Sequence, residues 1–143
     1  MNGVYAKVKE FKRKYPLTIS HRLRAHSKVV EKHLNPGEIV TYAFAAQKNE
    51  KLFDIFDTAI VAVTNHRILV VQKKVFFGYS LNSITPDLYN DTKVKAGIIF
   101  GTIEIDTVKE KLIYSDISKG ALPEIETEIS SFMIEAKKKY IEK

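Results

Sequence analysis

The run Asn35-Pro36-Gly37 divides this chain of 143 residues into two parts with different hydrophobic periodicities. Before it, apolar residues recur every three or four positions, which is typical of helices. After it, they alternate or form short runs, which is typical of strands. Proline cannot continue a helix, and glycine suits the chain reversal that follows one. We therefore expect a helical arm over residues 1–35 and a separate, mainly β domain over residues 36–143.

The arm is predicted to contain two helices. The first ends before Pro16, because the residue before a proline disfavours the helical region. Its apolar face, with spacings of four, three and four positions, consists of Val4, Val8, Phe11 and Tyr15. The second helix begins with Ser20 as its cap and runs to about residue 34. Its apolar side consists of Leu23, Val30 and Leu34.

The positive charge of the chain is concentrated in this arm. Residues 1–35 contain nine Lys or Arg and two acidic residues, a net charge of +7, whereas residues 36–143 contain fourteen and fifteen, a net charge of −1. The total of +6 therefore belongs to the first quarter of the sequence. A nearly neutral domain with a cationic arm is the predicted charge plan.

About seven short antiparallel strands and a final amphipathic helix are predicted after residue 37. The strands are expected over residues 39–46, 59–63, 67–72, 75–80, within 84–94, 98–108 and 111–116. In the sixth, Ile99, Gly101, Ile103 and Ile105 should face one way. The final helix starts near Pro123 and has an apolar stripe of Ile125, Ile129, Phe132, Ala136 and Tyr140. Closing the strands into a barrel would remove exposed edges, and the helix would fill one open end.

Several strings in this second part resemble the bacterial YokE-like pleckstrin-homology (PH) domain family. They are Pro36 to Tyr42, Val61 to Leu69 with its Thr-Asn-x-Arg core, Phe77-Gly78, Leu81 to Ile84, and Gly97 to Ile105. The resemblance covers roughly residues 36–135. It implies an α+β, mainly β fold: a PH-like barrel of about seven antiparallel strands, capped by a C-terminal helix and preceded here by two extra helices. It also implies no catalytic activity and no cofactor. The wider PH fold suggests a surface that binds lipid, binds a peptide or mediates self-association.

Residue patterns for catalysis or metal binding are weak. There is no cysteine, which removes disulfides and thiolate chemistry. No Gly-x-Ser-x-Gly, P-loop or Gly-x-Gly-x-x-Gly string is present, and Asp54 and Asp57 lack a nearby base. His26 and His33, seven residues apart on a helix, would be roughly 10 Å apart, too far for one zinc ion; we expect both to face solvent. We predict no enzyme, no catalytic residue, no metal and no cofactor.

The turn Thr64-Asn65-His66-Arg67 admits two interpretations. An exposed His-Arg pair at a hairpin corner could hold an anion. The interpretation we favour is structural, with Asn65 forming the turn because asparagine tolerates left-handed backbone and bonds its own backbone. Arg67 would then pair with a neighbouring carboxylate or carbonyl.

The candidate contacts with an anionic surface are Lys7, Lys9, Lys12, Arg13 and Lys14 in the first helix, and Lys73 and Lys74 at a strand corner. The arm could lie on an anionic membrane with its apolar stripe entering the interface, contact a protein, or follow nucleic-acid phosphates. The alternative that we favour is that the stripe packs on the barrel or a second protomer while the lysines stay in solvent. No apolar run approaches the length needed to span a bilayer.

The function expected from these observations is a non-enzymatic PH-like binding or scaffolding module, acting through protein interaction or self-association. The second hypothesis is a peripheral membrane module that uses the cationic first helix. Nucleic acid is disfavoured because no groove-reading helix or aromatic sheet surface is evident, and no small-molecule substrate is indicated. We expect a cytoplasmic location, with the inner membrane surface as the alternative.

Overall fold

The computed structural model describes residues 3–18, 20, 22–47, 58–73 and 78–141, without the side chains of residues 73, 140 and 141. It contains three α-helices: α1 (Val4–Lys14), α2 (Leu23–Lys32) and α3 (Leu122–Ile141). Its strands are β1 (Val40–Gln47), β2 (Thr58–Thr64), β3 (Ile68–Lys73), β4 (Tyr79–Ile84), β5 (Tyr89–Ala96), β6 (Phe100–Thr107) and β7 (Lys111–Ser118). A single 3₁₀ turn, Lys119–Ala121, leads into α3.

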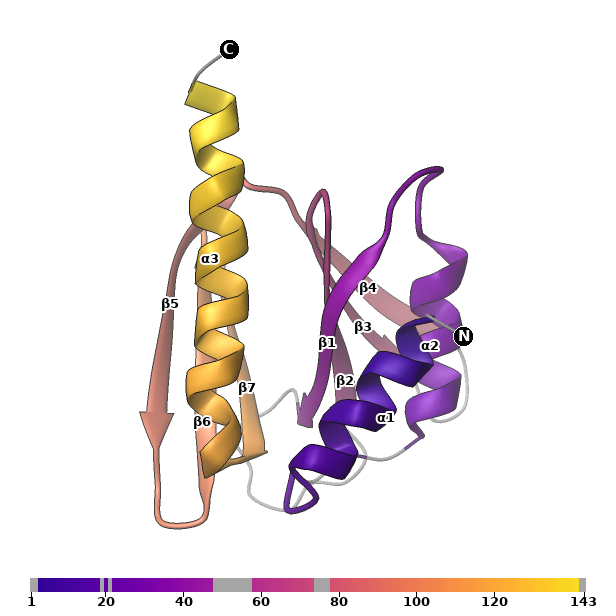
Figure 1. The fold of residues 1–143 in the computed structure, drawn as a ribbon, viewed down its shortest axis with the longest axis vertical. Helices are drawn as coiled ribbons and strands as arrows, with labels where there is room; N and C mark the ends of the chain where they lie inside the picture. Colours follow the sequence, from indigo (N-terminus) through magenta and orange to yellow (C-terminus); the bar gives the residue numbers. More distant parts are fainter. Residues whose placement is uncertain (1–2, 19, 21, 48–57, 74–77, 142–143) are drawn as a thin grey trace.

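The strands form one antiparallel sheet in the order β4-β3-β2-β1-β7-β6-β5. Among the described residues, the two halves of this sheet pair at Gln47 of β1 and Ser115 of β7. The sheet curls into a half-barrel, with α3 lying across its concave side (Figure 1). This confirms the predicted PH-like fold, including the strand count and the terminal helix.

The concave side of the sheet encloses the main hydrophobic core with α3. Ile125, Ile129 and Met133 of α3 are fully buried against it. Phe132, predicted as a member of the buried stripe, is only partly buried. The predicted helical periodicity is therefore correct, but Met133, and not Phe132, is the fully buried residue of that turn.

The convex side of β1, β2 and β3 is covered by α1 and α2. This second core joins Val4, Val8, Val29 and Val30 of the helices to small and branched residues of the strands, Ala43, Ala45, Ile60, Ala62, Leu69 and Val71. Every residue of β2 is buried, because helices cover the sheet on both faces at this strand. The run of apolar residues on both faces of β2 is thus explained.

Some predicted boundaries were wrong. The second helix begins at Leu23, after Arg22 in left-handed backbone (φ 57°), and its cap has no side-chain hydrogen bond. Ser20 is buried and does not cap it. The fourth strand was predicted over residues 75–80, of which 75–77 lie outside the described residues. It begins at residue 79, after Gly78 in left-handed backbone (φ 67°), and runs on to Ile84. Ile99 precedes β6 and is 54% exposed, because the hairpin turn occupies residues 97–99.

No helix among the described residues is long and apolar enough to cross a membrane.

Candidate functional site

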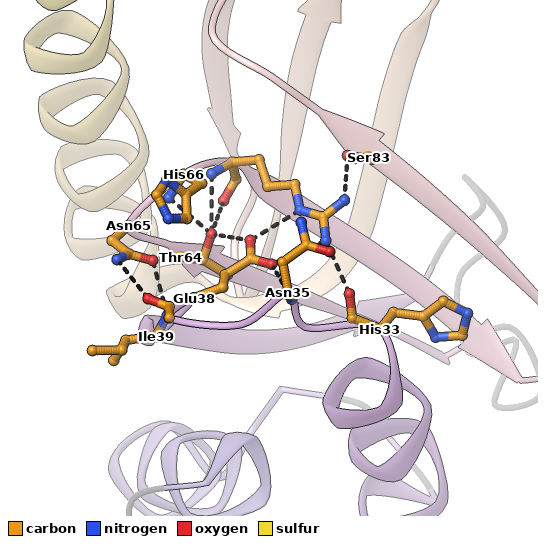
Figure 2. Close-up of polar contacts among 10 residues, drawn as sticks. His33, Asn35, Glu38, Ile39, Thr64, Asn65, His66 and Ser83 are labelled. Carbon is orange, nitrogen blue, oxygen red and sulfur yellow. Dashed lines mark hydrogen bonds and ion pairs between the residues drawn. The ribbon is translucent and has the colours of Figure 1, made fainter.

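A buried ion pair between Glu38 and Arg67 holds together the segments around the β2–β3 turn (Figure 2). Arg67 Nε donates to Glu38 Oε2 at 2.9 Å and Nη2 donates to Oε1 at 3.0 Å. The same guanidinium donates to Ser83 Oγ of β4 at 3.0 Å and to the His33 carbonyl at 2.9 Å. One side chain therefore links the end of α2, the 35–38 connection, β3 and β4.

The Glu38 side chain has no exposed surface. Burial by itself would raise the pKa of this carboxyl, but the hydrogen bonds from Arg67, the Asn35 backbone amide and Thr64 outweigh it and lower the pKa to about 2. Asn35 N donates at 2.9 Å and the Thr64 hydroxyl at 2.7 Å. The carboxylate is thus held ionised inside the fold, and Arg67 is engaged by it.

Asn65 secures the turn through its side chain. Its Oδ1 accepts from Ile39 N at 2.8 Å, and its Nδ2 donates to the Gly37 carbonyl at 3.2 Å. Its backbone is not left-handed, so the first of the two predicted reasons for its presence was wrong. The structural interpretation of Thr64-Asn65-His66-Arg67 is confirmed, since Arg67 pairs with the carboxylate of Glu38.

The histidines differ from the prediction that both face solvent. His26 is 2% exposed, with Nδ1 2.7 Å from the Arg22 carbonyl, so that prediction was wrong. His33 is partly buried, and its Nε2 lies 2.9 Å from the Tyr79 hydroxyl. No cluster of His, Cys, Asp or Glu suited to a metal ion occurs among the described residues. Asp54 and Asp57 lie outside them.

The cationic candidates of α1 are spread around the helix. Lys9 lies 5.3 Å from the centre of the Tyr5 ring, Arg13 is exposed, and Lys12 donates to the Thr18 carbonyl. Lys14 forms an ion pair with Glu124 of α3. Lys7 lines a hollow with Glu10, Glu124 and Glu128. Lys73 belongs to β3, but its side chain and all of Lys74 lie outside the described residues.

The two terminal strands of the sheet differ in charge. β5 has Asp91, Lys93 and Lys95, and each of these side chains is exposed. β4, with the sequence Tyr-Ser-Leu-Asn-Ser-Ile, has no charged residue and no proline. Natural sheets protect an unpaired edge with charges, proline or a cover, so β4 is the less protected edge.

A hollow of about 320 Å³ lies beside β4, where the half-barrel is open. β4 contributes Leu81, Asn82, Ser83 and Ile84 to its wall, and the opposite wall includes Leu88 and Leu112. The wall across from β4 also carries Lys109 and Glu110, so the hollow has both apolar and polar walls. A strand that ends the sheet of the described residues, beside such a hollow, can accept an extended segment. This arrangement was not found from the sequence, because it requires knowing which strands end the sheet.

The model of the bacterial PH domain family matches residues 34–131. The chain belongs to the bacterial PH domain family. No curated protein matches the chain. PH domains are generally non-catalytic modules that bind proteins or lipids. The match leaves the whole of α1 and α2 outside the family's own region.

Outside the family match, α1 is anchored to α3 of the PH domain. Besides the Lys14–Glu124 pair, Tyr15 donates to Glu124 Oε1 at 3.1 Å and Tyr42 donates to Oε2 at 2.9 Å. Burial, followed by the bonds and charge of Glu124, raises the pKa of Tyr42, which keeps this hydroxyl a donor. Phe11 packs beneath them against Phe44, with ring centres 5.9 Å apart. Packing of the stripe on the barrel, the favoured prediction, agrees with these contacts.

The sequence-based candidates missed a basic surface on α2, which precedes the PH domain. Arg24 lies 5.2 Å from the centre of the Tyr5 ring, and Lys9 of α1 lies 5.3 Å from the same centre. A shallow hollow on the same helix is lined by Arg22, Arg24, Lys28 and Lys32. The spacing of 24, 28 and 32 places these three cations on one helix face, a signal that was readable in the sequence.

Proposed function

We propose that this PH domain is a non-enzymatic scaffolding module that associates with a second copy of its own chain along β4. The observation that carries the proposal is the uncharged, unpaired edge of β4 beside the opening of the half-barrel. Adding a strand to such an edge satisfies backbone donors and acceptors that otherwise face water. The Thr64-Asn65-His66-Arg67 string also supports placing the chain in the YokE-like group of the family.

A two-fold arrangement of β4 strands is geometrically self-consistent. Cross-strand neighbours in an antiparallel pair point to the same face, so a symmetric pair centred on Leu81 sets Leu81 opposite its own copy and Tyr79 opposite Ser83. Leu81 is partly buried against the α2 side of the sheet, and its exposed part would be covered by the partner. A closed two-fold contact uses the same surface on both copies.

The Glu38–Arg67 network supports this role for β4. Arg67 donates to Ser83 near the end of β4, and the ring of Tyr79 at the start of the strand lies 5.2 Å from the ring of His33. The strand is therefore fixed at both ends before association, which lowers the ordering cost of binding.

Sedimentation velocity over a concentration series tests the proposal with two matched variants. Asn82→Lys adds a charge to the β4 edge, and in the two-fold pair it brings the two copies' charges close together. Asn90→Lys adds the same charge to the exposed β5 edge. We expect Asn82→Lys to weaken association at least tenfold and Asn90→Lys to leave it unchanged. A wild-type chain that stays monomeric at the highest concentration, or equal association by both variants, would refute the proposal.

We also propose that the boundary near residue 35 separates an accessory arm from the PH domain proper, and that the protein acts in the cytoplasm.

A further inference from the structure

One end of the molecule presents three exposed aliphatic side chains from segments far apart in the sequence. Ile98 and Ile99, in the turn between β5 and β6, are 92% and 54% exposed, and Leu17, in the loop after α1, is 61% exposed. In Figure 1 the β5–β6 turn and the loop after α1 both lie at the lower end, near the start of α3. The segments that carry these three side chains therefore lie at one end of the molecule, and we call Leu17, Ile98 and Ile99 together the aliphatic tip.

Adjacent backbone amides hold the two parts of the tip together. Ser118 N donates to Thr18 Oγ1 at 2.8 Å, and Lys119 N donates to the Ile99 carbonyl at 3.0 Å. Consecutive residues are 3.8 Å apart along the backbone, so these bonds set the loop after α1 beside the β5–β6 turn. The fold itself therefore holds the two segments of the tip next to each other.

The segments that meet at the tip carry basic residues and no acidic ones. Residues 12–18, 95–100 and 118–123 contain five cations, Lys12, Arg13, Lys14, Lys95 and Lys119. Lys14 is paired with Glu124, and Lys12 donates to the Thr18 carbonyl. Arg13, Lys95 and Lys119 are exposed. The segments that form the tip therefore carry three exposed cations, and the first acidic residue that follows them, Glu124, is paired with Lys14.

This combination fits an anionic membrane surface better than a protein partner. Protein interfaces are enriched in aromatic residues and depleted in lysine at their centres, whereas the tip is aliphatic and exposed, and its segments carry Lys95 and Lys119. The boundary of an anionic leaflet accepts aliphatic side chains and attracts lysine and arginine.

We propose that the aliphatic tip docks on an anionic membrane surface. Leu17, Ile98 and Ile99 enter the boundary between headgroups and acyl chains, while Arg13, Lys95 and Lys119 lie at the headgroups. This differs from the predicted membrane contact through the stripe of α1, because Val4, Val8 and Phe11 are buried against the sheet. The tip is separate from the β4 edge, and its role does not depend on self-association.

Vesicle co-sedimentation of the full chain tests the proposal. One vesicle preparation contains phosphatidylglycerol and phosphatidylcholine in equal parts, and the other contains phosphatidylcholine alone. The tip variant is the double substitution Ile98→Asp with Ile99→Asp. The matched control is Val108→Asp, which changes a 65% exposed aliphatic residue at the other end of β6.

We expect the wild-type chain and Val108→Asp to sediment with the anionic vesicles and not with phosphatidylcholine. The tip variant should bind at least tenfold more weakly, with an unchanged unfolding midpoint, and added salt should weaken wild-type binding. No binding of the wild type to anionic vesicles, equal binding to both preparations, or equal binding by the tip variant would overturn the proposal. Asn82→Lys should bind vesicles like the wild type, which keeps this test independent of the β4 contact.

A fluorescence measurement reports the depth of the tip directly. The chain contains no tryptophan, so Ile98→Trp introduces a single reporter, and Val108→Trp introduces its control. Anionic vesicles should shift the emission of Ile98→Trp to shorter wavelength and leave that of Val108→Trp unchanged. Unchanged emission from Ile98→Trp, or equal shifts from both, would overturn insertion of the tip.

Discussion

Glu38 and Arg67, 29 positions apart in the chain, are joined by two hydrogen bonds of 2.9 and 3.0 Å, and the Glu38 side chain that accepts both has no exposed surface. Arg67 also donates to the end of α2 and to β4. The pair therefore fixes the helical arm and the edge strand relative to the β2–β3 turn. A change in either residue should be felt by all of these elements.

Replacing Arg67 by leucine should lower the free energy of unfolding by about 3–5 kcal/mol, because Glu38 would remain buried without its cation. Urea denaturation measures the change. Arg13→Leu, at an exposed position of α1, should change stability by less than about 0.5 kcal/mol. A loss at Arg67 no greater than that at Arg13 would show that the pair is not structural.

Acid should destabilise the protein through Glu38. Its pKa is about 2 in the folded protein against an ordinary value of 4.5, so between these values the unfolded chain binds more protons. Stability should therefore be fully present above about pH 4.5 and fall by about 3 kcal/mol as the pH drops through about 2.

Denaturation curves between pH 2 and pH 6, for the wild type and Glu38→Gln, test this dependence. The stability of the variant should depend less steeply on pH than that of the wild type. Some dependence should remain, because the pKa of Glu124 is also lowered in the folded protein. Identical slopes in the two proteins would contradict the assignment to Glu38.

The first helix should be part of the cooperative unit. Phe11 is 3% exposed and packs against Tyr15 and Phe44, so Phe11→Ala should cost about 3–5 kcal/mol through lost burial and a cavity. Lys9→Ala, on the solvent side of the same helix, should be nearly neutral. If Phe11→Ala left the main unfolding transition unchanged, α1 would be an independent appendage.

Gly101 occupies a position in β6 where a side chain does not fit. A Cβ there would lie 2.3 Å from Leu122 Cδ1 and 3.0 Å from its Cγ, and Leu122 is itself buried. Gly101→Ala should therefore lower the unfolding free energy by about 1–3 kcal/mol. Gly120→Ala would meet its nearest atom, Tyr15 Cε1, at 4.0 Å, and should cost less. Urea denaturation of the two variants measures the difference, and an equal cost would contradict the predicted clash at Gly101.

Local patterns in the sequence predicted most of the fold. The alternation of Ile103 and Ile105, the doubly apolar run of β2 and the spacing of Ile125 and Ile129 all depend on neighbours within one element. Contacts between segments far apart in the sequence were harder to predict. Nothing local indicates that Glu124 receives hydrogen bonds from both Tyr15 and Tyr42, or that His26 is buried.

The candidate surfaces were harder to predict than the core. Whether a strand ends a sheet depends on the order of all strands, so the open edge of β4 could not be seen in its six residues. The exposure of Ile98 and Ile99 was also missed, because both residues continue the apolar pattern of β6 across the hairpin turn. A helical stripe such as Val4, Val8 and Phe11 predicts a buried face but does not say what covers it.

Hydrogen–deuterium exchange of the β4 backbone, compared between dilute and concentrated protein, tests the proposed self-association most directly. Association along the edge should slow exchange across Tyr79–Ile84 in the concentrated sample, and leave Tyr89–Ala96 of β5 unchanged. Asn82→Lys should abolish the difference. Exchange in β4 that is the same at both concentrations, or protection that appears on β5 instead, would contradict the account.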